Sequence, residues 1–216
     1  MPRIVDHTER RARLVEVTAR HIADVGLDNV RLRDVARHAG STTGMVSHYF
    51  ADKRSLLLST FRSRTEGARR LITEAVENGA SQLDAIIEAV LPLDDERTLN
   101  WQVWLAFWGA AVGDGELAAE QRYRYEVFTL GLSQAVEAAK YDGNLRRDVD
   151  APQTARYLAA LLDGIAVQAM FAPELWPREE QRRFIVEHLR PLRATKARRA
   201  VGDHRRTPAK QQSGVT

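Results

Sequence analysis

The sequence of 216 residues contains no cysteine, which excludes disulfide bonds and thiolate metal sites. It has no apolar run approaching the roughly 20 residues that a membrane-spanning helix needs. Its first residues, MPRIVDHTERR, contain no apolar signal segment. These absences fit a reducing compartment, and we expect a cytoplasmic protein with no membrane partner.

Catalytic and metal-site motifs are also missing. The six histidines show no HExxH spacing, no G-x-S-x-G occurs, and no glycine-rich loop that would cradle a phosphate is present. We therefore predict that the protein is not an enzyme and that it needs no cofactor and no metal ion.

No segment alternates β-branched and polar residues as a strand would, and no internal repeat is visible. Apolar residues instead recur at helical spacing between turn signals such as Asn78-Gly79 and Asp142-Gly143-Asn144. This pattern predicts an all-α fold. About nine helices are expected, over residues 7–25, 32–39, 42–48, 52–78, 81–91, 98–112, 116–140, 151–171 and 178–189.

The formal net charge of +3 conceals an asymmetry along the chain. Residues 1–62 have a net charge of +4, residues 63–190 of −7 and residues 191–216 of +6. A basic head on an acidic body indicates a polyanionic partner at the head. The last segment also loses its apolar periodicity, so we predict a disordered basic tail over 191–216. Such a tail either adds affinity for DNA or is a solvated extension.

The most specific pattern in the chain is LRDVARHAGSTTGMVSHYFADK, residues 32–53. Its first half has helical apolar spacing and ends at Gly40, where glycine best adopts a left-handed conformation. A second short apolar set begins at Met45. Two short helices joined by such a turn predict a helix-turn-helix, whose second helix enters a DNA major groove. A purely structural helical hairpin is the alternative.

We expect the second helix of this motif to contact DNA. Hydroxyl groups can bond to base edges or phosphates, and a glycine permits close backbone approach. Tyr49 is expected to anchor the helix with its hydroxyl free for a phosphate, and Lys53 to hold the DNA backbone. Arg3 and the cluster Arg10–Arg13 of the first helix either reach phosphates or belong to a solvated basic face. The candidate DNA-binding residues are Arg31, Thr42, Thr43, Gly44, Ser47, His48, Tyr49 and Lys53, with Thr42, Thr43 and His48 facing the bases.

Three of the four tryptophans, Trp101, Trp104 and Trp108, fall at i, i+3 and i+7 of one predicted helix. Their rings either form core or line a pocket, which would suit a cationic ligand through cation–π attraction. Four aromatic residues of neighbouring predicted helices could complete either arrangement: Tyr125, Phe128, Tyr157 and Phe171.

Asp163 interrupts the most apolar predicted helix, residues 151–171. Burying a carboxylate without a partner costs several kcal/mol. Asp163 therefore either forms a structural salt bridge or helix-end contact, or faces the positive group of a ligand. It completes the candidate ligand-binding set of Trp101, Trp104, Trp108, Tyr125, Phe128 and Asp163.

The same helix is apolar on more than one face, which is typical of a helix that packs on two sides. With residues 178–189 it could form a four-helix bundle between two copies of the chain. We therefore expect a homodimer through the last two predicted helices. The residues expected there are Ala155, Leu158, Ala159, Leu162, Ala166, Ala169, Phe184, Ile185 and Leu189.

The head resembles the tetracycline-repressor (TetR) family of bacterial regulators over about 50 residues. The resemblance is carried by Asp34-Val35-Ala36, Ala39-Gly40, Thr43-Gly44, His48-Tyr49-Phe50 and Lys53 with Leu56-Leu57. The body, at Trp104–Trp108 and Leu162-Asp163-Gly164, is similar to the branch typified by the choline-responsive repressor of betaine synthesis (BetI).

This resemblance implies a DNA-binding head over 1–51 and an all-helical ligand-binding and dimerisation body over 52–190. It also implies a dimer that binds a palindromic operator and releases it when a small-molecule effector enters the body. Arg31 and Ser41 depart from the family's usual residues, and the similarity in the body does not extend to the identity of the ligand. A ligand-independent or nucleoid-type DNA-binding protein is the alternative.

Overall fold

The computed structural model describes residues 7–194, and over that range it contains α-helices, one short 3₁₀ helix and no β-strand. This confirms the all-α prediction. The α-helices are α1 (His7–Val25), α2 (Leu32–His38), α3 (Thr43–Tyr49), α4 (Lys53–Glu77), α5 (Gln82–Val90), α6 (Asp95–Ala111), α7 (Gly115–Tyr141), α8 (Ala151–Phe171) and α9 (Arg178–Leu189). None of these helices has both the length and the apolar character needed to cross a lipid bilayer.

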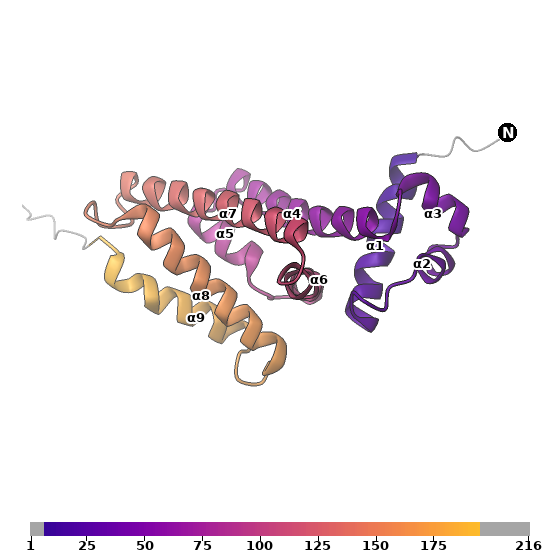
Figure 1. Cartoon of the computed structure of the whole chain (residues 1–216). Coiled ribbons are helices and arrows are strands. Elements are labelled where there is room, and N and C mark those ends of the chain that lie inside the picture. Colours follow the sequence, from indigo (N-terminus) through magenta and orange to yellow (C-terminus); the bar gives the residue numbers. More distant parts are fainter. Residues whose placement is uncertain (1–6, 195–216) are drawn as a thin grey trace, which may run out of the picture.

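The helices form a small head and a larger body (Figure 1). Helices α1, α2 and α3 gather at one end of the molecule, and α5, α8 and α9 lie toward the other. Helix α4 runs from the head along the body, and α6 crosses between the two parts.

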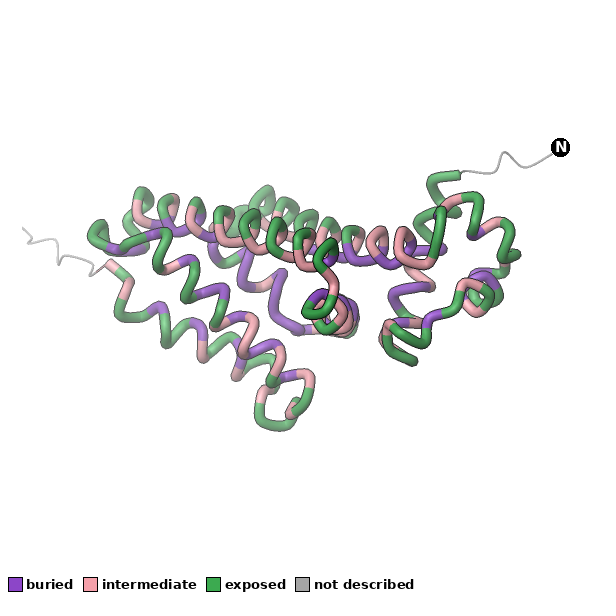
Figure 2. Tube along the Cα trace, viewed as in Figure 1, coloured by how far each residue is buried: buried purple, intermediate pink, exposed green. Residues whose placement is uncertain are grey.

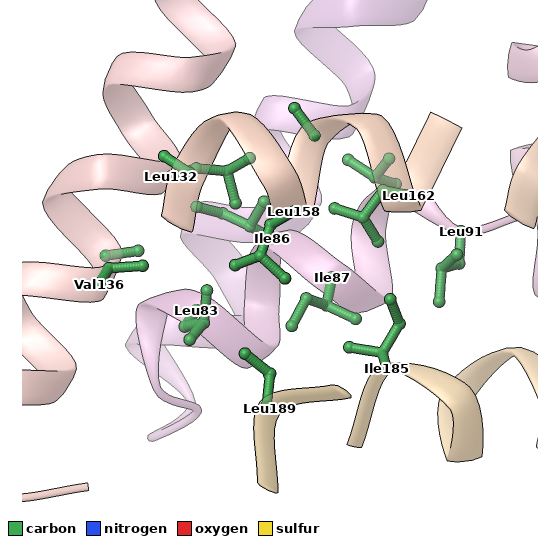
Figure 3. Packing of buried hydrophobic residues seen from close by; sticks show 14 of the residues in the cluster. Leu83, Ile86, Ile87, Leu91, Leu132, Val136, Leu158, Leu162, Ile185 and Leu189 are labelled. Atoms are coloured by element: carbon green, nitrogen blue, oxygen red, sulfur yellow. The ribbon is translucent and has the colours of Figure 1, made fainter. Parts of the chain in front are cut away.

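The body is held together by one large apolar cluster. Figure 3 shows its side chains converging from α5, α7, α8 and α9. Those labelled there are Leu83, Ile86, Ile87, Leu91, Leu132, Val136, Leu158, Leu162, Ile185 and Leu189. Burial of so many aliphatic groups, each stabilising by about 1.5–3 kcal/mol, fixes how these four helices pack.

The head has its own core, but helices beyond the head complete it. Val35 and Val46 of the helix-turn-helix are fully buried against α1. Leu56 of α4 and both Leu99 and Val103 of α6 belong to the same cluster. Helix α6 therefore contributes to the packing of the head as well as to that of the body.

The turn between α2 and α3 forms as the sequence predicts. Gly40 has a φ of +65°, a left-handed conformation that other residues rarely adopt. Its N–H donates to the Arg37 carbonyl at 3.1 Å, and the Ser41 N–H donates to the Ala36 carbonyl at 2.8 Å. These two bonds form a Schellman motif and satisfy the last carbonyls of α2.

The residues expected at a dimer interface are mostly in the wrong place for one. The small and aliphatic residues of α8, such as Ala155 and Leu162, are buried in the chain's own core, as are Ile185 and Leu189 of α9. The opposite faces of these helices are exposed (Figure 2). The sequence shows that α8 is apolar on more than one face. It does not show which of these faces packs against the chain's own core and which is left for a second copy.

The first residues of the segment expected as a disordered tail, 191–194, are ordered, so the expectation is wrong for them. Residues Arg190–Leu192 form the 3₁₀ helix, and Arg193 pairs with Leu145 as an isolated bridge. The Arg146 N–H donates to the Leu192 carbonyl at 2.9 Å. Residues 195–216 lie outside the described residues.

Candidate functional site

Helix α3 is short and is fixed at both ends. The Thr42 hydroxyl accepts a hydrogen bond from the Met45 N–H at 3.2 Å, which caps the first turn. Val46 is fully buried, and Phe50 follows the helix into the head core. These anchors determine which side of α3 faces solvent.

The exposed side of α3 carries most of the candidate DNA-contacting residues. Thr42, Thr43, Gly44, Ser47 and His48 are all exposed, so the structure brings them together on one surface. Arg31 stands apart from this group. It is exposed at the N-cap position of α2, where its side chain makes no capping hydrogen bond.

Tyr49 is half-buried, and its hydroxyl is not free as the sequence suggested. The hydroxyl lies 2.8 Å from His7 Nδ1, at the start of α1. The His48 ring packs edge-on against Tyr49, with ring centroids 5.3 Å apart. Tyr49 therefore ties the first turn of α1 to the end of α3, and any phosphate contact has to share its hydroxyl with His7.

Lys53 is the first residue of α4, and Asp52 and Ser55 form a capping box around it. The Lys53 ammonium donates to the Asp28 carbonyl at 2.9 Å. An ammonium group has three N–H donors, so this bond leaves two for a DNA phosphate.

The three predicted tryptophans do form one cluster on α6. The Trp101 ring meets those of Trp104 and Trp108 edge-on, with centroids 5.3 and 5.5 Å apart. The Trp108 ring lies 5.8 Å from that of Tyr125 on α7. Phe128, one turn further along α7, is half-buried against the body core.

The tryptophans differ in what their indole N–H groups contact. Trp101 is fully buried and donates to the Val90 carbonyl at 2.6 Å, so it is a structural residue. Trp104 is half-buried, and its buried Nε1 has no hydrogen-bond partner in the described structure. The Gln121 Oε1 of α7 is buried and unpartnered in the same way. An unpaired buried polar atom costs about 1–3 kcal/mol, which a bound molecule can recover.

Tyr157 and Phe171 do not complete this cluster. Their side chains are 66% and 81% exposed on the outer face of α8. The expectation that they join the aromatic cluster is therefore wrong, because α8 turns these two residues away from α6.

Asp163 of α8 is half-buried and accepts a hydrogen bond from the Tyr125 hydroxyl at 2.6 Å. It forms no ion pair within residues 7–194. Burial raises the pKa of the Asp163 carboxyl to about 6, although the Tyr125 hydrogen bond opposes the shift. Burial, with the adjacent carboxylate, also raises the pKa of the Tyr125 hydroxyl, which stays protonated. The structural salt bridge offered by the sequence is absent, so the carboxylate at this site lacks a counter-charge.

Comparison with known proteins identifies the family. Residues 79–194 match the family described as BetI-type transcriptional repressor, C-terminal. Residues 14–60 match the family of bacterial regulatory proteins, tetR family. The chain belongs to the TetR family.

Individual relatives agree with this assignment. The transcriptional regulator BetI of Cronobacter sakazakii is 29% identical over 195 residues, covering 88% of this chain and 94% of that protein. The regulator PksA of Bacillus subtilis is 24% identical over 202 residues, covering 89% and 94%. A regulator from Saccharomonospora viridis, crystallised in complex with choline, has a TM-score of 0.79 and 23% identity and covers 88% of this chain and 100% of its own. This TetR-family protein is a DNA-binding transcriptional regulator with a ligand-binding C-terminal domain, and not an enzyme.

A charged cluster that the sequence analysis missed joins the head of this TetR-family regulator to its body. Arg64 of α4 is only 8% exposed, and its guanidinium pairs with Glu16 of α1 and Glu96 of α6. A signal was available, because Arg64 continues the buried positions Phe61 and Ala68 at helical spacing. Its acidic partners are 48 and 32 residues away along the chain, so no local sequence pattern predicts the pairing.

Within the described range, no group of three or more His, Asp or Glu side chains is arranged to hold a metal ion. The candidate functional surfaces of this regulator are the exposed side of α3 in the head and the aromatic cluster with Asp163 in the body.

Proposed function

We propose that this TetR-family regulator is a homodimeric repressor that leaves a palindromic operator when a small cationic effector binds its body. The observation that carries the proposal is the position of α6. This helix holds Leu99 and Val103 in the head core and Trp101, Trp104 and Trp108 in the aromatic cluster. A ligand that repacks the tryptophans therefore acts on a helix that the head rests on.

In this proposal α3 enters the major groove. Thr42, Thr43 and His48 face the bases, and Gly44 with Ser47 permits close approach of the helix. Three further residues hold the phosphate backbone: Arg31, Tyr49 and Lys53. The exposure of the α3 side chains and the two remaining donors of Lys53 support these roles.

Two substitutions separate base reading from backbone contact. Lys53→Ala is expected to weaken binding to every duplex. It should also make the negative slope of log affinity against log salt less steep by about 0.9 for each head, because one phosphate contact is lost.

Thr43→Val is expected to change operator preference by about 1–3 kcal/mol at one base pair, because a base-edge hydrogen bond is lost. Fluorescence anisotropy on operator and scrambled duplexes at several salt concentrations measures both. A Thr43→Val protein that binds every duplex as the parent does would contradict the base-reading role.

The effector we propose is an alkylammonium compound. Asp163 supplies a carboxylate with no ionic partner in the described structure. Tyr125 donates a hydrogen bond to it, and the Trp108 ring lies against that of Tyr125, so aromatic surface adjoins the carboxylate. A carboxylate next to aromatic rings is the environment in which a cation with methyl groups is stabilised. The similar regulator from Saccharomonospora viridis was crystallised with choline, which supports the same chemistry here.

Release follows from linkage between the two sites. If the effector binds one arrangement of α6 more tightly and DNA binds the other, each ligand lowers the affinity of the other by the same factor. A coupling of about 1–3 kcal/mol gives a 5- to 150-fold change in operator affinity. Packed cores switch between discrete arrangements, so a small displacement at the tryptophans is enough.

The experiment is an operator-release titration. The operator is first selected from a random duplex pool, and its affinity is then measured with increasing choline and with 3,3-dimethylbutanol, which has the same shape and no charge. We expect choline to release the operator and the neutral compound to leave it bound. If no alkylammonium compound changes the affinity, the cationic effector is refuted. If the selection also returns no preferred sequence, the ligand-independent, nucleoid-type alternative holds.

We further propose that the dimer forms through the exposed faces of α8 and α9. Four large apolar residues are exposed on these helices and the loop between them: Tyr157, Phe171, Leu175 and Val186. Apolar patches of this kind mark contacts with another protein. A two-fold dimer also places two α3 helices at half-sites about 34–36 Å apart, as a palindrome requires.

Phe171→Glu combined with Tyr157→Glu is expected to convert the dimer to a monomer, because two charges would have to be desolvated on each side of the interface. Sedimentation velocity measures the change. Val112→Glu is the matched control, because Val112 is 91% exposed directly after α6, a helix outside the proposed interface. A double variant that sediments like the parent would place the interface elsewhere.

The proposed arrangement has a DNA-binding head over residues 1–51 and a ligand-binding and dimerisation body over 52–190, and it acts in the cytoplasm, where the DNA is. The acidic net charge of the body supports this division, because it leaves the head as the surface that attracts DNA.

A further inference from the structure

The first two turns of α1 present a basic surface beside α3 that the helix-turn-helix itself does not account for. Arg10 and Arg13, together with Leu14, line a hollow of about 380 Å³ whose other side is the turn between α2 and α3. The turn residues that line it run from Ala39 to Thr42. A second hollow, of about 470 Å³, extends from Arg10 to Gly44 and His48 of α3. Arg10 therefore lies between two hollows that both end on the proposed recognition helix.

Arg10 and Arg13 differ from three other arginines of the head, whose side chains have partners. Arg20 pairs with Glu16 at 3.0 Å, and Arg37 pairs with Asp34 at 3.3 Å. Arg11 donates to a serine of α4 and lies over the Phe50 ring. Within the described residues, no such partner engages the side chain of Arg10 or Arg13, and both are exposed. They are two free cations held on a rigid helix.

Contacts within the head fix the position of this surface relative to α3. The Tyr49 hydroxyl lies 2.8 Å from His7 Nδ1, which ties the start of α1 to the end of α3. Leu14 is buried in the head core, one residue after Arg13. Figure 1 shows the N-terminal end of α1 beside α3. The distance between the arginines and α3 therefore changes little when α3 docks.

We propose that Arg10 and Arg13 form a second DNA-backbone site, which binds phosphates flanking the groove that α3 enters. The surface extends the footprint of each head beyond the helix-turn-helix. The ligand is the phosphodiester backbone of double-stranded DNA, because guanidinium forks match phosphate oxygens and the hollow presents the hydroxyl-bearing residues Ser41 and Thr42 beside them. This inference rests on the proposed operator binding, and it adds affinity without adding sequence preference.

The test is the salt dependence of binding by Arg10→Gln combined with Arg13→Gln. Two lost phosphate contacts are expected to make the negative slope of log affinity against log salt less steep by about 1.8 for each head. The ratio of parent to variant affinity should therefore be roughly 60 times larger per head at 0.1 M salt than at 1 M salt. Operator and scrambled duplex should lose the same factor, so their affinity ratio stays constant.

The matched control is Arg20→Gln combined with Arg37→Gln, which removes the same charge from the same head at arginines that already have acidic partners. It is expected to leave the slope close to that of the parent, and thermal melting checks that both double variants fold. An Arg10/Arg13 variant whose slope matches the control overturns the proposal, as does one whose operator-to-scrambled ratio collapses. A parent protein that binds no duplex would refute operator binding itself, which keeps the two failures apart.

Discussion

Replacing Glu16 and Glu96 together by glutamine is expected to lower the free energy of unfolding by about 3–5 kcal/mol. The reason is that Arg64 is 8% exposed and both of its ionic partners are lost. A guanidinium cannot give up its proton, so its charge would remain buried without a counter-charge. Urea denaturation followed by circular dichroism measures the change.

The reverse substitution is expected to cost far less. Arg64→Met keeps the straight aliphatic stem, and it leaves two glutamates whose side chains are 35% and 57% exposed and can turn to water. Replacing a buried charge by an apolar group of similar volume is often nearly neutral, so we expect a loss of about 1 kcal/mol or less. If Arg64→Met proves as damaging as the double glutamine variant, the cost lies in lost packing and not in an unpaired charge.

Asp163→Asn is expected to weaken binding of a quaternary ammonium effector by roughly 30-fold or more, which is the effect of removing one partner from a desolvated charge pair. The asparagine oxygen still accepts the Tyr125 hydrogen bond, so the geometry of the site is kept. Isothermal titration with choline measures the loss. A variant that binds choline like the parent would show that Asp163 does not face the cation.

The same substitution is expected to stabilise the empty protein above pH 6. Burial raises the pKa of Asp163 to about 6 from an ordinary value of 3.8, so the folded state holds this proton more tightly than the unfolded state does. Stability is therefore lost as the pH rises from about 4 to 6, and the full cost is present above that range. Asp163→Asn removes the cost, on the order of 1–3 kcal/mol. Thermal melts should show a gain at pH 8 and little at pH 4.

The affinity for the effector should also depend on the ionisation of Asp163, but it should rise with pH where the stability falls. Choline keeps its charge at every pH, so only the protein changes. Its affinity is expected to be constant above pH 7 and to fall by up to tenfold for each pH unit below 6, as Asp163 becomes neutral. The Asp163→Asn protein provides the baseline, because its affinity should not change over this range. Loss of activity thus accompanies gain of stability at one residue, a trade-off expected of ligand sites.

The sequence predicts the helices well, because apolar spacing and turn residues act locally. Gly40 and Gly143 adopt the left-handed conformations that end helices, and these positions are readable without a structure. Asp163 is conspicuous for a similar reason, since a charge within an apolar helix has to be explained. Each of these signals involves only a few neighbouring residues.

What the sequence does not predict is which helices cross where. Tyr125 and Asp163 meet although they are 38 residues apart, and His7 reaches Tyr49 across 42. Such pairs depend on how α1, α3, α7 and α8 pack, which no local pattern encodes. The same limit explains the error over α8, where the apolar face assigned to a second copy is filled by the chain itself.

The head core contains Leu99 and Val103, residues that arrive from the middle of the chain. The head therefore cannot be transferred to another body without loss of part of its core. A chimera that joins residues 1–51 to the body of another regulator, as in the construction of biosensors, exposes apolar side chains of α1, which packs against α6, unless the new body offers matching side chains. The specificities for operator and effector can be recombined only together with the part of α6 that fits between them.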